Sequence, residues 1–318
     1  MSGLHPQVVA FLERVAQSPL PPYYTLAPHV ARRVYHDTRT VLSPAPPEVA
    51  ESRLVLASAP AGSIALRMIR PAGAARQERL PALVFFHGGG FTIGDLDTHD
   101  VLCRQLANGA RCAVVSVDYR LAPEHRFPAA VEDAIAATQW VAREARALAI
   151  DPQRIAVGGD SAGGNLAAVV ALEARDAGGP ALAFQLLIYP AIDQRCEFAS
   201  HRRNGEGYLL TRRHIEYFRA HYLPRREDWL DWRASPLLAK STAGLPPAFI
   251  VTAGFDPLVD EGRAYAERIA ADGGAVTYLD FPDMIHGFIT FGGVLGTANA
   301  AVDECCARLR AAFEQVTA

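Results

Sequence analysis

Lysine, long apolar runs and paired-cysteine motifs are almost or wholly missing from this sequence. Of its 31 basic residues only Lys240 is a lysine, and no basic block alternates with aromatic residues, so a nucleic-acid partner is not expected. No segment approaches about 18 consecutive apolar residues, so no transmembrane helix is predicted. The opening stretch MSGLHPQVVAFLER lacks a basic region, and its apolar run is too short for a secretory signal. We therefore expect no membrane partner.

Cysteine usage gives no sign of a disulfide framework. The number of cysteines is odd, and none of them forms a C-x-x-C pair. This pattern suits a reducing compartment, so we expect a cytoplasmic protein, and it offers no zinc site. The five positions are Cys103, Cys112, Cys196, Cys305 and Cys306.

Short apolar runs alternate with helical patterns from Leu80 onwards. Runs that are apolar throughout are typical of parallel strands buried on both faces, with helices between them. Two earlier strand patterns, Arg53–Leu56 and Ile64–Arg70, flank a turn and predict an antiparallel pair. Helices are predicted near 98–111, 128–148, 161–176, 258–272 and 298–316. The six later strands are predicted at Ala82–Phe86, Ala113–Val117, Arg154–Val157, Phe184–Tyr189, Phe249–Thr252 and Val276–Phe281.

The composition and the spacing of these elements predict one core with a lid. Hydrophobic residues make up 50% of the chain and charged residues 20%, which is ample for a sizeable core. Residues 1–45, with one helix near His5–Gln17, are expected to form a mobile arm outside that core. The excursion at 195–235, with a helix at Tyr208–Leu223, is far longer than a usual connection and should complete the lid. The core is then assigned to 46–194 and 236–318.

Ser161 stands between a strand-like run and a helical pattern of small residues, in the segment RIAVGGDSAGGNLAAVV. The residues around it fit the G-x-S-x-G nucleophile elbow, a strained turn that exposes the serine hydroxyl. Such a turn needs nearly bare positions two residues before and after the serine, and Gly159 and Gly163 meet that need. An ordinary glycine-rich turn is the alternative, but the flanking strand and helix favour the elbow. Ser161 is therefore a candidate nucleophile.

Backbone N–H groups that could hold an oxyanion are predicted at two places. The helix that starts at Ser161 presents free N–H groups, among them that of Ala162. His87-Gly88-Gly89-Gly90 directly follows a predicted buried strand, at the sheet edge where α/β proteins bind ligands. We predict Gly88 and Gly89 as the donors of this loop. His87 is interpreted as a structural residue that fixes the loop.

The serine needs a histidine within hydrogen-bond reach, and ten histidines compete for that role. Most lie in the predicted lid or arm, or in polar stretches without a catalytic pattern. His286 differs because it follows the last predicted strand, in the loop FPDMIHGF. We predict His286 as the general base.

The acidic partner is expected between the serine and the histidine, because hydrolases with this elbow carry that order. Asp256 lies just beyond the strand Phe249–Thr252, so its carboxylate should reach the same sheet edge. We predict Asp256 as the acid of the triad. The rivals are Asp260, Glu261, Asp280 and, most seriously, Asp283.

Five motifs in order carry a family resemblance: HGGGF at 87–91, DYRLAPEHRFPAA at 118–130, GDSAGG at 159–164, DPLVDEG at 256–262 and HGF at 286–288. Together they resemble the hormone-sensitive-lipase-like esterases of the α/β-hydrolase superfamily, over residues about 50–318. The resemblance implies an α/β-hydrolase fold with a mostly parallel eight-stranded sheet, flanking helices and a helical cap. It implies the triad Ser161, Asp256 and His286, with Gly88, Gly89 and Ala162 as oxyanion donors. It also implies that DYRLAPE, with Glu124, is a structural support.

A serine carboxylesterase acting through an acyl-enzyme, without metal or cofactor, is the leading interpretation. Amide, formamide or lactone hydrolysis uses the same machinery, and the motifs do not separate these reactions. A non-catalytic ligand receptor, like the resembling plant gibberellin receptors, would have lost the base, whereas His286 is retained.

The lid and the last strand lead to two further expectations. A lid over one opening predicts a small-molecule ester with an acyl chain of about four to eight carbons, a range that the resemblance also implies. The strand Val276–Phe281 could form an exposed sheet edge, and the resemblance points to a homodimer through this edge.

Overall fold

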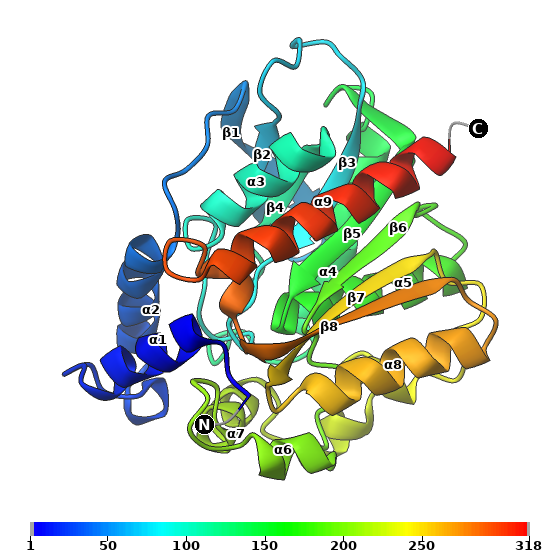
Figure 1. Ribbon diagram of the computed structural model, residues 1–318. Helices are drawn as coiled ribbons and strands as arrows, with labels where there is room; N and C mark the ends of the chain where they lie inside the picture. The colour runs from blue at the N-terminus through cyan, green and yellow to red at the C-terminus, as the bar shows by residue number, and fades with distance from the viewer. Residues whose placement is uncertain (1–2, 317–318) are drawn as a thin grey trace.

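An eight-stranded sheet forms the centre of the molecule in this computed structural model, which describes residues 3–316 (Figure 1). Its strand order is β1-β2-β4-β3-β5-β6-β7-β8. β2 is antiparallel to both of its neighbours, and all other pairs are parallel, which confirms the predicted mostly parallel sheet. The strands are β1 (Glu51–Ala59), β2 (Gly62–Arg70), β3 (Leu80–Phe86), β4 (Ala113–Val117), β5 (Ile150–Asp160), β6 (Phe184–Ile188), β7 (Ala248–Phe255) and β8 (Val276–Ile285).

Helices cover both faces of this sheet. Every residue of β3, β4 and β6 is buried, as expected for apolar strands enclosed on both sides. α3 (Asp100–Ala110) and α9 (Gly296–Gln315) pack on one face and cross in front of the strands in Figure 1. α4 (Ala129–Glu144), α5 (Ala162–Asp176) and α8 (Val259–Ala271) pack in the apolar cluster on the other face. These five helices were predicted within a few residues of their observed ends.

The N-terminal arm differs from the prediction in two ways. α1 (Pro6–Ala16) was expected outside the core, but its apolar side is buried in the same cluster as Phe291 of the C-terminal half. α2 (Pro28–Leu42) was not predicted at all. Only Ala31 and Tyr35 of α2 are buried, so its sequence carries too narrow an apolar stripe to be recognised.

The segment between β6 and β7 contains α6 (Ala199–Arg203), α7 (Arg212–Tyr222) and the 3₁₀ helices η2 (Arg226–Leu230) and η3 (Pro236–Leu238). α7 begins one residue after Thr211, whose side chain and that of His214 form a reciprocal capping box. The hydroxyl of Tyr217 on α7 donates to the carbonyl of Leu26, so this segment touches the N-terminal arm. Figure 1 shows α1, α2, α6 and α7 together at one end of the sheet.

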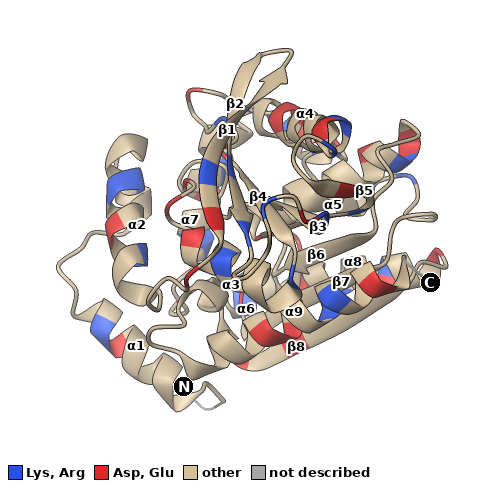
Figure 2. Ribbon diagram, turned by 90° about the horizontal axis from the view of Figure 1, so that it is seen from above, with Lys and Arg blue, Asp and Glu red and all other residues tan. Residues whose placement is uncertain are grey.

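Charges of both signs are dispersed over the molecule. In the view of Figure 2, basic and acidic residues are interspersed along α2, α4 and α9, in keeping with a net charge of -3. Within residues 3–316 no helix is long and apolar enough to cross a membrane.

Candidate active site

Ser161 occupies a strained turn between β5 and α5. Its φ of 56° and ψ of -117° are unusual for a residue with a side chain. The turn is held by the backbone on both sides: the N–H of Ser161 donates to the carbonyl of Ile188 at 2.8 Å, and its carbonyl accepts from the N–H of Ala191 at 3.1 Å. Because neighbouring backbone fixes the turn, the strain is maintained and the hydroxyl is presented at the sheet edge.

The two glycines that flank Ser161 are required by close backbone approach. A Cβ atom on Gly163 would overlap the carbonyl oxygen of Phe86 in β3, and one on Gly159 would overlap the backbone of Gly163. The predicted need for bare positions two residues before and after the serine is confirmed.

The structure brings the three predicted triad residues into one chain of contacts. His286 follows β8, and its Nε2 lies 3.0 Å from Oγ of Ser161. Asp256 follows β7, and its Oδ2 lies 2.6 Å from Nδ1 of His286. The other oxygen of Asp256 accepts from the N–H of Leu258 at 2.8 Å, and this side chain is fully buried. The carboxylate is thus held in one orientation toward the imidazole, which in turn faces the serine.

Each rival acid has another partner or position. Asp260 accepts from the backbone N–H of Ser200 at 2.9 Å, and Asp280 accepts from the hydroxyl of Thr252 at 2.7 Å. Asp283, expected in a loop, lies inside β8, which extends to Ile285. None of them touches His286 in the described part of the chain.

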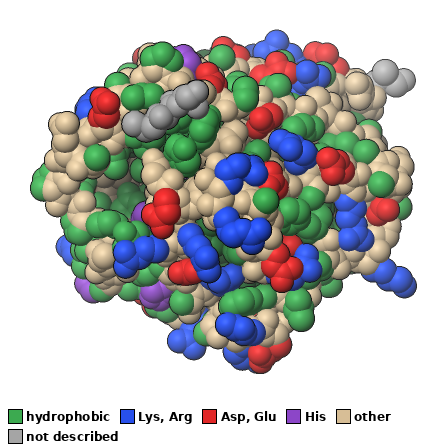
Figure 3. Space-filling view, turned by 60° about the horizontal axis from the view of Figure 1, so that its bottom comes forward, with side chains coloured by type: hydrophobic (Ala, Val, Ile, Leu, Met, Phe, Trp, Pro, Cys, Tyr) green, Lys and Arg blue, Asp and Glu red, His purple; other side chains and the backbone are tan. Residues whose placement is uncertain are grey.

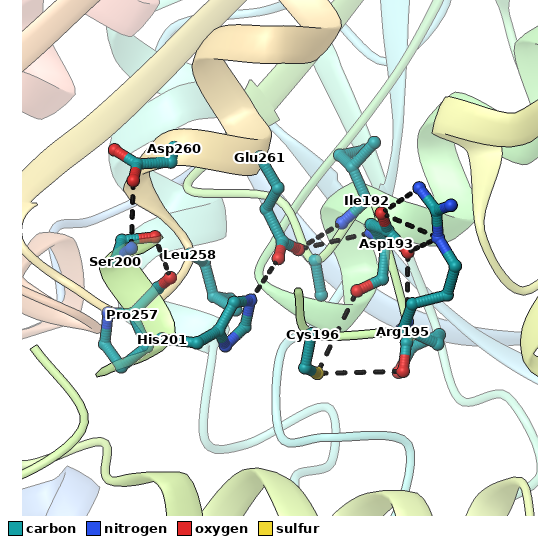
Figure 4. A network of polar contacts seen from close by, with 12 residues as sticks. Ile192, Asp193, Arg195, Cys196, Ser200, His201, Pro257, Leu258, Asp260 and Glu261 are labelled. Carbon is teal, nitrogen blue, oxygen red and sulfur yellow. Dashed lines mark hydrogen bonds and ion pairs between the residues drawn. The ribbon is translucent and has the colours of Figure 1, made fainter. Parts of the chain in front are cut away.

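Glu261, the remaining rival, forms a buried pair with His201 of α6. Its Oε2 lies 2.7 Å from Nε2 of His201, while its Oε1 accepts from the backbone N–H groups of Ile192 and Asp193 (Figure 4). Burial raises the pKa of Glu261 above its ordinary value, although His201 opposes the shift. This network joins α6 to α8. Nothing in the sequence indicates this pair, because the two side chains are 60 positions apart.

The predicted role of Gly88 as an oxyanion donor is wrong. Its N–H already donates to Oδ1 of Asp160 at 2.8 Å, and Gly88 does not line the cavity around Ser161. Gly89, Gly90 and Ala162 do line it, and the N–H groups of Gly89 and Gly90 meet no acceptor among the described residues. Three consecutive glycines look alike in the sequence, so only the geometry separates the anchored N–H from the open ones.

Buried polar residues support this glycine loop from beneath. The ring of His87 stacks on that of Tyr119, with centroids 4.3 Å apart, and its Nδ1 donates to the carbonyl of Gly88 at 2.8 Å. Burial lowers the pKa of His87 to about 4, so this histidine is neutral at physiological pH, in agreement with the predicted structural role. Burial would raise the pKa of Asp160, but His99, 3.1 Å away, and Arg39 lower it below the ordinary value. A charged Asp160 thus anchors the Gly88 amide.

A cavity of about 850 Å³ opens above Ser161 and His286. Its walls are mostly apolar and come from the glycine loop, from α1 and α2 of the arm, and from α7 of the insertion. In Figure 3 hydrophobic side chains border a hollow on the left of the face that carries these elements. The two segments predicted to form the lid therefore both contribute to the walls.

One group of possible metal ligands occurs in the described part of the chain. His36, Asp95 and Asp97 place ligand atoms within 4.8 Å of one another. One Asp95 oxygen lies 3.1 Å from Nδ1 of His36, and the other accepts from the backbone N–H groups of Asp97 and Thr98. These contacts explain the cluster as part of a turn, and none of the three residues lines the cavity.

The sheet topology and the Ser161 turn define an α/β-hydrolase, and comparison with known proteins agrees. A family model described as the alpha/beta hydrolase fold matches residues 83–290. The chain therefore belongs to this family, and the predicted resemblance to its hormone-sensitive-lipase-like esterases is confirmed.

Several named relatives and solved structures are similar to the chain. "Carboxylic ester hydrolase LipN" of Mycobacterium tuberculosis is 48% identical over 263 residues, which cover 81% of this chain and 69% of LipN. "Ethyl acetate hydrolase" of Pseudomonas putida is 36% identical over 305 residues, which cover 93% of this chain and 95% of that hydrolase. Among solved structures, the chain is similar to a serine-to-alanine variant of LAE6, an alpha/beta hydrolase from the metagenome of Lake Arreo, Spain. The TM-score is 0.95 and the sequence identity 44%, and the match covers 99% of this chain and 100% of the LAE6 chain.

Proposed function

We propose that this protein is a serine carboxylesterase that hydrolyses esters with short to medium acyl chains. The observation that carries the proposal is the chain of contacts from Asp256 through His286 to Ser161 at the wall of a largely apolar cavity. Relatives named as ester hydrolases support the same reaction class.

In the proposed mechanism Ser161 is the nucleophile and His286 the general base. As Oγ of Ser161 forms a bond to the ester carbonyl carbon, Nε2 of His286 takes the hydroxyl proton. Collapse of the tetrahedral intermediate breaks the bond to the alcohol oxygen, which receives that proton from His286. Water then attacks the acyl-enzyme, gives its proton to His286, and releases the acid while Ser161 is reprotonated. Asp256 orients the imidazole and stabilises its charged form.

The oxyanion of the intermediate is proposed to lie against the N–H groups of Gly89, Gly90 and Ala162. The support is that these residues line the cavity beside Ser161, whereas Gly88 does not. Asp160, by accepting from the N–H of Gly88, would hold the loop in place. A single donor of this kind contributes about 3 kcal/mol to lowering the barrier.

Acyl-chain length is the test of the proposed substrate class. Each added methylene should contribute about 0.8 kcal/mol of favourable burial until the cavity is filled, after which further carbons stay in water or displace the cap. We expect kcat/KM on nitrophenyl esters to peak at about four to eight acyl carbons and then to fall. A value that still rises with long-chain esters, or strong activation by emulsified triglyceride, would contradict this substrate range.

We also propose a cytoplasmic homodimer that pairs through β8. All five cysteines are free, which suits a reducing compartment. β8 is an edge strand of the sheet, and edge strands offer unpaired N–H and carbonyl groups to a second copy. Light scattering at micromolar concentration should give the mass of two chains, and a monomer mass would count against the pairing.

A further inference from the structure

Arg39 places a guanidinium at the wall of the cavity that contains Ser161 and His286. It lies on α2, and its Cζ is 4.5 Å from the ring centroid of Tyr35 and 4.6 Å from that of Phe291. Its Nη1 donates to the hydroxyl of Thr290 at 2.7 Å. The two rings and this hydrogen bond fix the orientation of the guanidinium.

The guanidinium lies beside the residue that follows His286. A Cβ atom built on Gly287 would lie 3.7 Å from Nη2 of Arg39, an ordinary contact distance, so the guanidinium lies next to the backbone that follows His286. Both Arg39 and Gly287 line the cavity. A cation in this place faces the space that a bound ester must fill.

Arg39 has no carboxylate partner in the described part of the chain. Its buried Nε has no hydrogen-bond partner, and among residues 3–316 no carboxylate oxygen lies within 4.0 Å of its nitrogens. A guanidinium is always charged and carries five N–H donors, so most of its capacity to bind an anion is unused. Burial disfavours this charge, but the nearby tyrosines and Asp160 raise the pKa of Arg39 overall, so the guanidinium stays charged and able to bind an anion.

The acidic residues of the same cavity do not supply this anion. Asp160 is near enough to be influenced by Arg39, but it contacts the Gly88 amide and His99. The other two buried acids each have a partner of their own at 2.7 Å, Arg195 beside Asp193 and His201 beside Glu261. Asp37, the remaining acid of the lining, is exposed.

We propose that Arg39 binds a carboxylate of the substrate, so that the natural substrates include esters that carry a second, free carboxylate, such as monoesters of dicarboxylic acids. A planar carboxylate can accept two parallel N–H bonds from a guanidinium, which makes the contact both strong and oriented. This inference rests on the proposed esterase function and narrows its substrate class.

The test compares matched pairs of esters in wild-type protein and three variants. The anionic substrates are the monoethyl esters of succinic, glutaric and adipic acids. Each neutral partner has an isopropyl group in place of the carboxylate, and so has nearly the same shape. The variants are Arg39→Met, which removes the charge, Arg39→Lys, which keeps it without the planar fork, and Arg33→Met. Arg33 is an exposed residue of the same helix that does not line the cavity.

For at least one pair we expect Arg39→Met to lower the ratio of anionic to neutral kcat/KM tenfold or more, mainly through KM. Arg39→Lys should recover part of the ratio, and Arg33→Met should leave it unchanged. If Arg39 only supports the structure around Thr290, Arg39→Met will slow both members of each pair equally, and the inference is overturned. It is also overturned if wild-type protein hydrolyses the neutral esters and none of the anionic ones. If wild-type protein hydrolyses no ester of either series, the esterase proposal itself is rejected, and this inference with it.

Discussion

Replacement of Ser161 with alanine is expected to lower kcat/KM for ester hydrolysis by about 10⁴- to 10⁶-fold. Nε2 of His286 lies 3.0 Å from Oγ of Ser161, and among the described contacts no other hydroxyl group is hydrogen-bonded to that imidazole. Alanine keeps the Cβ atom, so the turn between β5 and α5 should survive with the same backbone contacts. Steady-state hydrolysis of a nitrophenyl ester measures the loss.

Two comparisons show whether this loss is chemical. The thermal unfolding midpoint of Ser161→Ala should stay within a few degrees of wild type. Ser63→Ala, at the exposed start of β2, should keep full activity. Turnover by Ser161→Ala close to that of wild type would remove the serine from the mechanism.

The second large effect is expected for Asp256→Asn, with a fall in kcat of about 10⁴-fold. An asparagine can present an N–H group to Nδ1 of His286, which then favours the tautomer that carries its proton on Nε2. That tautomer cannot accept the proton of Ser161, although the packing is almost unchanged. Because Asp256 is fully buried and 2.6 Å from His286, solvent cannot take its place.

Asp283→Asn is the matched control for Asp256→Asn. Asp283 is only three residues from His286 and was the strongest rival in the sequence, but it lies inside β8 without a contact to the imidazole. We expect Asp283→Asn to change kcat by less than about threefold, in line with most surface substitutions. If the two variants lost activity equally, the assignment of the acid would be wrong.

The parts of the fold that could be predicted are those whose signal is local. Every residue of the short strands β3 and β4 is buried, and the sequence predicted the bounds of both strands to within two residues. Ser161, Asp256 and His286 each follow a strand of this sheet, so the rule that carboxyl ends meet at one edge was enough to bring them together.

What could not be predicted depends on contacts between distant segments. Only Ala31 and Tyr35 of α2 are buried, so its apolar stripe is narrow, and neither the helix nor Arg39 drew attention. His201 seemed to be one lid histidine among several, yet it pairs with Glu261. Gly88 was chosen over Gly90 because nothing in HGGG itself reveals that Asp160 takes the first glycine's N–H.

Covalent trapping tests the central claim, the nucleophilic role of Ser161, most directly. Wild-type protein would be treated with the organophosphate diethyl 4-nitrophenyl phosphate, and the site of modification would be found by peptide mass spectrometry. The account predicts one diethylphosphoryl group per chain, on Oγ of Ser161, that appears in parallel with the loss of esterase activity. Loss of activity with the label on another residue, or undiminished hydrolysis by protein fully labelled at Ser161, would contradict it.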